Sequence, residues 1–308
     1  MGTGRQGFGV GVFYVLIANF GWSLSGLFVR LINSSDENRL TGWQINCWRG
    51  FWMAVALLCY ALLRYGFDTG KIFNRIPRFA MFISALCFAA GTTFYVTSLT
   101  LVPTATVSVI GATSPLFAGL LSRWITGERP SIYAWLAALV AIAGTVVIAW
   151  NGIQTGQMSG LLLCFGVPLT FAAQTLLLRR YRAYDMMPAI CAGGVLSFLV
   201  AGTVSLFSFA GPSAFDIDFH DFFLLMLMGP VQLAIPLVFY GLGAKTVQGV
   251  TLALLAMMDA VINPFWSWLF AGEIPERSSI IGGAIILLAV ALSVAGQAWQ
   301  NKRELVVA

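Results

Sequence analysis

One carboxylate, Asp259, lies within an apolar stretch that is long enough to cross a membrane. A charged side chain near the middle of a bilayer costs on the order of 3 kcal/mol even on a lenient insertion scale, so it normally faces a partner or a watery cavity. We expect Asp259 to bind a substrate ammonium group or to take up a proton. The alternative is a structural carboxylate that is hydrogen-bonded to a neighbouring helix or held neutral by burial.

Other polar and aromatic side chains fall inside similar apolar stretches. The amides both donate and accept hydrogen bonds, which suits the two ends of a zwitterion, and the aromatic rings offer surface to an apolar side chain. The alternative for each amide is a hydrogen bond between two helices, worth about 0.6–2 kcal/mol. Together with Asp259, the predicted substrate-binding residues are Asn19, Trp22, Tyr95, Gln174, Gln232, Tyr240 and Asn263.

Three basic residues near the ends of apolar stretches are weaker candidates. Arg30 and Arg49 are expected near the outer membrane face, where they snorkel or act as gate residues and are not ligands. Lys245 has two interpretations, a residue that attracts a substrate carboxylate or a cytoplasmic anchor, and we favour the anchor.

The sequence contains no GxSxG, HExxH or Walker motif and only one histidine, His220. An enzyme built on Asp259 would need a second carboxylate at a similar depth, and the sequence offers none. We therefore expect no enzyme activity, no cofactor and no metal. A metal site made by Asp216, Asp218 and His220 is the alternative to an interfacial segment in which alternate residues face opposite sides, which we favour.

The composition predicts an all-α integral membrane protein. The chain is 59% hydrophobic and 9% charged, whereas a soluble domain is about a quarter charged. About 20 apolar residues are needed for each helix that crosses a hydrocarbon core. Ten spans fit, at residues 9–31, 43–63, 79–100, 104–124, 131–150, 159–178, 187–210, 221–243, 248–271 and 279–299.

The basic residues predict the orientation of these spans, because Lys and Arg accumulate on the cytoplasmic side of a membrane. With the N-terminus inside, 13 of the 17 lysines and arginines are cytoplasmic. Both termini are therefore expected in the cytoplasm.

An internal repeat divides the chain into two halves. The segment 94–130, moved forward by 145 positions, aligns without a gap with the segment 239–275, and Tyr95/Tyr240 and Glu128/Glu273 are among the identical pairs. Each half, 1–150 and 151–308, holds five spans, so the second must be inverted relative to the first. Inverted repeats are typical of secondary transporters, which bind substrate near the midplane and alternate access.

These segments resemble the drug/metabolite transporter superfamily, specifically its ten-span members with paired EamA-type domains. The resemblance rests on the helix starts after Tyr95 and Tyr240 and on the two Gly-Glu pairs that end at Glu128 and Glu273. Within the superfamily the chain is most similar to bacterial exporters of aromatic amino acids, which implies a multi-pass protein of a bacterial-type inner (plasma) membrane. One departure is Asp259-Ala260, where the family often has Glu-Pro; the proline is at Pro264 instead, which should move the helix bend by one turn.

The expected function is export of small metabolites, first of all amino acids with apolar or aromatic side chains, through a central cavity. A multidrug or other metabolite exporter of the same fold is the first alternative, and a non-transporting membrane scaffold is the alternative of a different class. The expected partners are a small amino acid-like substrate and the lipid bilayer, with no nucleic acid. Monomer and homodimer both stay open.

Overall fold

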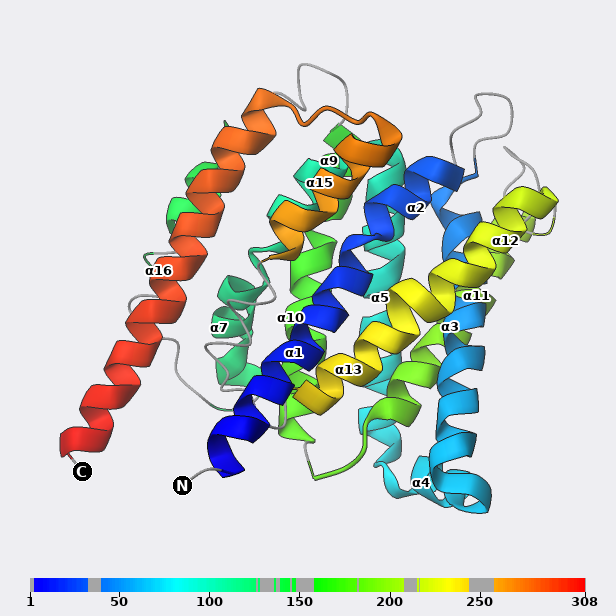
Figure 1. Cartoon of the computed structure of the whole chain (residues 1–308), viewed down its shortest axis with the longest axis horizontal. Helices are drawn as coiled ribbons and strands as arrows, with labels where there is room; N and C mark the ends of the chain where they lie inside the picture. The colour runs from blue at the N-terminus through cyan, green and yellow to red at the C-terminus, as the bar shows by residue number, and fades with distance from the viewer. Residues whose placement is uncertain are drawn as a thin grey trace.

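The computed structural model describes residues 3–32, 40–125, 127, 136, 139–144, 146–147, 158–181, 183–207, 215, 217–243 and 258–307, and this part of the chain is helical and contains no strand. Figure 1 shows the helices packed side by side, with both termini at the same end of the bundle. In chain order they are α1 (Thr3–Ser23), α2 (Ser25–Ile32), α3 (Gly42–Tyr65), α4 (Thr69–Arg75), α5 (Arg78–Leu101), α6 (Thr104–Gly111), α7 (Ser114–Ile125), α9 (Met158–Cys164), α10 (Gly166–Arg180), α11 (Met187–Phe207), α12 (Phe219–Leu227), the π-helical segment η2 (Met228–Ala234), α13 (Ile235–Gly243), α15 (Asp259–Ala271) and α16 (Arg277–Val307).

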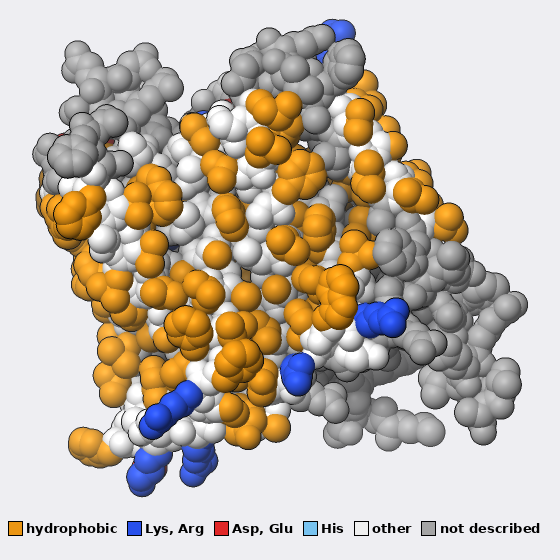
Figure 2. Space-filling view, turned by 180° about the vertical axis from the view of Figure 1, so that it is seen from behind, with side chains coloured by type: hydrophobic (Ala, Val, Ile, Leu, Met, Phe, Trp, Pro, Cys, Tyr) orange, Lys and Arg blue, Asp and Glu red, His pale blue; other side chains and the backbone are white. Residues whose placement is uncertain are grey.

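Six helical stretches in the described residues are long and apolar enough to cross a membrane, or seven if α6 and α7, which meet at a bend of 43°, form one span. Their outer surfaces carry many exposed large apolar side chains. Figure 2 shows these side chains covering one face of the molecule, with most of the visible lysines and arginines at the end where α4 lies in Figure 1. The prediction of an all-α membrane protein is therefore confirmed.

Some of the predicted features lie outside the described residues. These are most of the span at 131–150, the first ten residues of the span at 248–271, and the side chains of Glu128, Asp216 and Lys245. The segment before the eighth predicted span differs from expectation, because α12 begins at Phe219 and makes a helix where alternating residues were expected.

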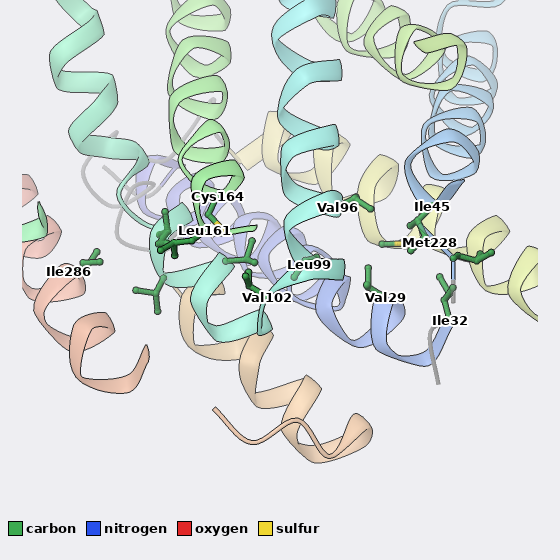
Figure 3. Close-up of a cluster of buried hydrophobic side chains, with 14 of the residues drawn as sticks. Val29, Ile32, Ile45, Val96, Leu99, Val102, Leu161, Cys164, Met228 and Ile286 are labelled. Atoms are coloured by element: carbon green, nitrogen blue, oxygen red, sulfur yellow. The ribbon is translucent and has the colours of Figure 1, made fainter. Parts of the chain in front are cut away.

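A buried apolar cluster joins helices from both halves of the chain (Figure 3). Val29 of α2 and Leu99 of α5 share it with Cys164 of α9, Met228 of η2 and Ile286 of α16. Lipid tails are as apolar as these side chains, so helices in a membrane associate through close packing and polar contacts more than through the hydrophobic effect. Shape complementarity in this cluster therefore contributes directly to holding the helices together.

Four of the predicted spans are interrupted in the described residues, namely the first, the fourth, the sixth and the eighth. The first is broken at Leu24, between α1 and α2, and the eighth contains the π-helical segment η2 with Pro230 inside it. Proline lacks an N–H and cannot make the usual helical hydrogen bond, so the local pairing shifts. In both places backbone groups and side chains turn toward neighbouring helices.

The break at Leu24 depends on the close approach of Gly26 to two helices. A Cβ on Gly26 would lie 2.3 Å from Thr104 Cγ2, 2.7 Å from Asn263 Oδ1 and 2.7 Å from Ser267 Oγ. The Gly26 N–H donates to that same Asn263 oxygen at 3.0 Å. An N–H in the first turn of α2 has no partner within its own helix, so α15 supplies one.

An ion pair ties the end of α2 to the connection between α15 and α16. Arg30 Nε donates to Glu273 Oε2 at 2.8 Å, and Arg30 Nη2 donates to the Val102 carbonyl at 2.9 Å. The same carboxylate accepts from the Thr104 backbone N–H at 2.5 Å and from the Thr104 hydroxyl at 2.7 Å. Glu273 thus holds the start of α6 against α2, an arrangement that agrees with a gate role for Arg30.

Replacing Gly26 with alanine is expected to lower the stability of the protein by about 1–3 kcal/mol, because the added methyl group overpacks the contact with Thr104 and Asn263. Thermal unfolding of the purified protein in detergent measures the effect. Gly241→Ala is the matched control, since Gly241 also lies in a helix and its Cβ would meet no atom within 4 Å. Equal melting temperatures for the two variants would contradict the packing argument.

Glu273→Gln is expected to destabilise the protein by about 1–2 kcal/mol, since the change removes a charge-assisted network whose side chains are only partly exposed to solvent. The control is Asp68→Asn, which breaks the ion pair with Lys71 at side-chain exposures of 65% and 74% and should cost almost nothing. Thermal unfolding again distinguishes them. A loss of the same size in both variants would show that the Glu273 network contributes no more than a surface pair.

Candidate functional site

Asn263 lies at the centre of a polar cluster that joins four helices. Its amide oxygen accepts from the Gly26 N–H of α2. Its amide nitrogen lies 3.1 Å from Ser25 Oγ, 2.8 Å from Tyr95 Oη and 3.0 Å from Ser108 Oγ. The side chain is completely buried, so both ends of this amide are satisfied in an apolar interior, as buried polar groups require.

Tyr95 brings an aromatic ring into the same cluster. Its hydroxyl shares a hydrogen bond of 2.5 Å with Ser25 Oγ in addition to the one from Asn263. The ring keeps some accessible surface, as do the rings of Trp22 and Tyr240, which pack on each other with centroids 5.0 Å apart. Three partly accessible aromatic side chains from α1, α5 and α13 therefore lie among the buried polar groups.

Asp259 is in the first turn of α15, four residues before Asn263. Residues four apart on a helix lie on one face, so the carboxylate and the Asn263 amide point to the same side of α15. Asp259 also interacts electrostatically with Tyr95. Its Oδ1 atom is buried and has no hydrogen-bond partner in the part of the chain that the structure describes. This carboxylate is therefore available to a ligand or a proton.

Gln232 connects η2 to two other helices. Its amide nitrogen donates to the Trp22 carbonyl at 3.3 Å, and its amide oxygen accepts from Arg49 Nε at 2.9 Å. The π-helical geometry around Pro230 places this side chain, since such segments turn a residue out of the regular helical register. The interrupted segment η2 therefore carries one of the predicted site residues.

The remaining two predicted residues are less central. Asn19 is buried on α1, three residues before Trp22, at 1% exposure. Gln174 of α10 pairs with Ser84 of α5 through two hydrogen bonds of 2.9 and 3.2 Å. This pairing has the geometry of a contact between helices, and neither of its residues bonds to the Asn263 cluster in the described part of the chain.

Arg49 was expected near the outer face as a snorkelling or gate residue, and the structure excludes the snorkelling interpretation. Its exposure is only 2%, and its guanidinium carbon lies 6.0 Å from the centroid of the Tyr95 ring. Arg49 is buried because it projects from the face of α3 that packs on η2. A signal was present in the sequence: Asn46, Arg49, Gly50 and Met53 follow the spacing of one helical face, and all four are buried.

The cluster thus contains a buried cation, a carboxylate, amides and aromatic rings. Among the described residues no group of histidine, cysteine and acidic side chains has the arrangement of a metal site. A separate small apolar pocket lies between α3, α4 and α11, lined by residues such as Leu57, Tyr65 and Met187. It includes none of the predicted site residues.

Known proteins with similar sequences are membrane transporters. The chain is 25% identical over 242 residues to the pseudopaline exporter CntI of Pseudomonas aeruginosa, and the alignment covers 77% of this chain and 81% of that protein. The chain is also 22% identical over 272 residues to the S-adenosylmethionine uptake transporter of Rickettsia prowazekii, and that alignment covers 86% of this chain and 88% of that protein.

A protein of known crystal structure has the same fold, with a TM-score of 0.61 and 20% identity over 94% of this chain and 97% of the other. Residues 9–150 match the EamA-like transporter family. This match confirms the resemblance that was drawn from the sequence. The chain therefore contains, in residues 9–150, an EamA-like domain of the drug/metabolite transporter superfamily.

Proposed function

We propose that the protein is a secondary transporter of the inner membrane that exports amino acids with apolar or aromatic side chains. The observation that carries the proposal is the Asp259 carboxylate, whose buried Oδ1 atom has no hydrogen-bond partner among the described residues and which interacts electrostatically with Tyr95, on the same helix as Asn263. A substrate ammonium group supplies the missing hydrogen-bond donor and the opposite charge. A proton taken up by Asp259 offers a means to release that ammonium group or to couple its movement to a gradient.

The aromatic rings suit the other part of such a substrate. Trp22 and Tyr240 form a tilted pair, and Tyr95 lies next to the polar cluster. Aromatic side chains favour tilted or edge-to-face contacts with further rings, worth about 0.5–1.5 kcal/mol beyond burial. An aromatic amino acid can therefore place its charged end near Asp259 and its ring near Trp22 and Tyr240.

The architecture that we propose has ten spans in two inverted five-helix repeats, residues 1–150 and 151–308, with both termini in the cytoplasm. Helix pairing supports it. Under the repeat, the contact of α1 with α13 corresponds to the contacts of α9 and the start of α10 with α5, and the contact of α3 with η2 corresponds to that of α11 with α5; all of these helix pairs are in contact. The pair α3 and α11 corresponds to itself and is also in contact.

Two glycines support the same symmetry. Gly21 and Gly166 are 145 residues apart, which is the offset of the repeat. A Cβ on Gly21 would lie 2.4 Å from Pro236 Cγ of α13, and a Cβ on Gly166 would lie 2.4 Å from the Phe94 ring of α5. Each glycine thus allows the first span of one half to approach the third span of the other half.

The relatives leave the cargo and its direction open, since one is named an exporter and another an uptake transporter. S-adenosylmethionine contains an amino acid group, which supports a substrate of this class. A multidrug exporter of the same fold is the second candidate, and the buried carboxylate among aromatic rings favours it too, because lipophilic cations bind to such surroundings.

Asp259→Asn is expected to reduce the uptake of labelled phenylalanine into proteoliposomes at least about tenfold, since a charge-assisted hydrogen bond contributes about 1.5–3 kcal/mol. The protein should remain folded, because the change keeps the size of the side chain. Asp218→Asn is the matched control: Asp218 is an exposed acid that makes no side-chain cap for α12.

Three outcomes of this uptake experiment decide the proposal. Saturable amino acid flux in the wild type that is lost in Asp259→Asn supports it. Flux of lipophilic cations without amino acid flux favours the multidrug alternative. Normal amino acid transport by Asp259→Asn removes this carboxylate from the mechanism.

A further inference from the structure

Arg49 is a buried cation that the proposed role of Asp259 does not use. Its side chain is 2% exposed. Nε donates to Gln232, whereas Nη1 is buried and has no hydrogen-bond partner among the described residues. No carboxylate of the described residues lies within ion-pair distance of this guanidinium; the described arginine that does pair with an acid is Arg30.

An unpaired arginine in this position is costly. A guanidinium remains charged at every physiological pH and carries five N–H donors. Burying such an ion costs several kcal/mol unless an opposite charge or further hydrogen bonds compensate. The guanidinium carbon lies 6.0 Å from the centroid of the Tyr95 ring, and this cation–π contact compensates only part of the desolvation cost. A charged group kept inside a membrane span at this cost indicates a functional site.

We propose that Arg49 binds the carboxylate of the transported substrate. This inference rests on the proposed function and specifies its site further. The planar guanidinium matches the two oxygens of a carboxylate, and Nη1 is the donor left for it. Gln232 fixes the plane of the guanidinium through Nε, and it is itself held by the Trp22 carbonyl.

Tyr95 connects the two charged residues. Arg49 of α3 approaches the face of its ring, and Asp259 of α15 interacts with it electrostatically. A zwitterion that spans Tyr95 meets a cation at its carboxylate end and a carboxylate at its ammonium end. Because the Asp259 charge repels a second negative charge, a singly charged carboxylate is favoured over a phosphate ester at Arg49.

The test compares Arg49→Gln with the wild type for binding and transport of phenylalanine, phenethylamine and 3-phenylpropionate, which carry both charges, only the ammonium and only the carboxylate. Binding is measured by thermal stabilisation in detergent and transport by uptake into proteoliposomes. Arg49→Gln should weaken the binding of phenylalanine about 10- to 100-fold and leave the binding of phenethylamine unchanged. Arg49→Lys should recover part of the loss.

Arg64→Gln is the matched control, since Arg64 is an exposed residue in the last turn of the same helix, where it donates a hydrogen bond to Tyr60 and lies over the Tyr65 ring. Gln232→Glu is a second variant that keeps the test decisive if Arg49→Gln does not fold. It supplies Arg49 with an internal carboxylate, so the protein should melt at a higher temperature and lose binding of 3-phenylpropionate.

The outcomes separate this inference from the proposed function. Amino acid transport by the wild type with equal weakening of phenylalanine and phenethylamine in Arg49→Gln overturns the carboxylate role and leaves the function standing. Arg49-dependent binding of 3-phenylpropionate without amino acid transport supports the anion site and overturns the amino acid function. Failure of every carboxylate to stabilise the wild type overturns both.

Discussion

The hydrogen bonds of Asn263 are the constraint on which the interior of this protein depends. An amide in an apolar interior costs several kcal/mol unless each end finds a partner. Asn263 finds its partners on α2, α5 and α6. The break at Leu24, the glycine at position 26 and the close approach of α6 all serve these bonds, because a continuous helix or a larger side chain would remove the Gly26 N–H from reach. One side chain thus couples α15 to α2, α5 and α6.

Irregular helix geometry occurs at two of the polar contacts in the site, at the break before Gly26 and at η2. The π-helical segment η2 presents Gln232 to Arg49 and to the Trp22 carbonyl. In a bilayer, non-regular backbone is tolerated only where protein or a water-filled cavity satisfies its polar groups. The interruptions therefore occur next to one another in space, around Trp22 and Tyr95, although they are far apart in sequence.

Hydropathy and polar residues in apolar stretches predicted much of this arrangement. The helical membrane class was predicted, and Asn263, Tyr95, Gln232 and Trp22 do lie in connected hydrogen-bond networks. The burial of Arg49 was not predicted, because an arginine seven residues into a span can either extend to the membrane surface or turn inward. The direction that the side chain takes depends on which helix packs against that face of α3. The residues around Arg49 in the sequence do not specify this contact.

The same limit applies to the partners of the acidic residues. Glu273 was noticed as the counterpart of Glu128 in the repeat, but its bonds to Arg30 and Thr104 join segments about 170 to 240 positions apart. Gln174 illustrates the opposite case. An amide in a span was taken as a possible ligand, and its partner is Ser84 on the neighbouring helix. Polar character inside a span indicates that a partner exists, and only the packing of helices decides whether that partner is protein or substrate.

Under the proposed repeat, the charges of the site have neutral counterparts. Asp259 corresponds to Ser114, whose hydroxyl donates to the Gly111 carbonyl of its own chain segment, and Arg49 corresponds to Gly194, which packs against Gly50 of α3. A symmetric pair of halves can alternate between two access states, but a symmetric set of charges would bind a zwitterion equally well in two opposite orientations. In the site that we propose, one half supplies the cation and the other supplies the carboxylate, so a substrate with both charges would have a single favoured orientation and would hold the two halves together through its own charges. The symmetry of the scaffold and the asymmetry of its charges therefore have different roles, the first in movement and the second in recognition.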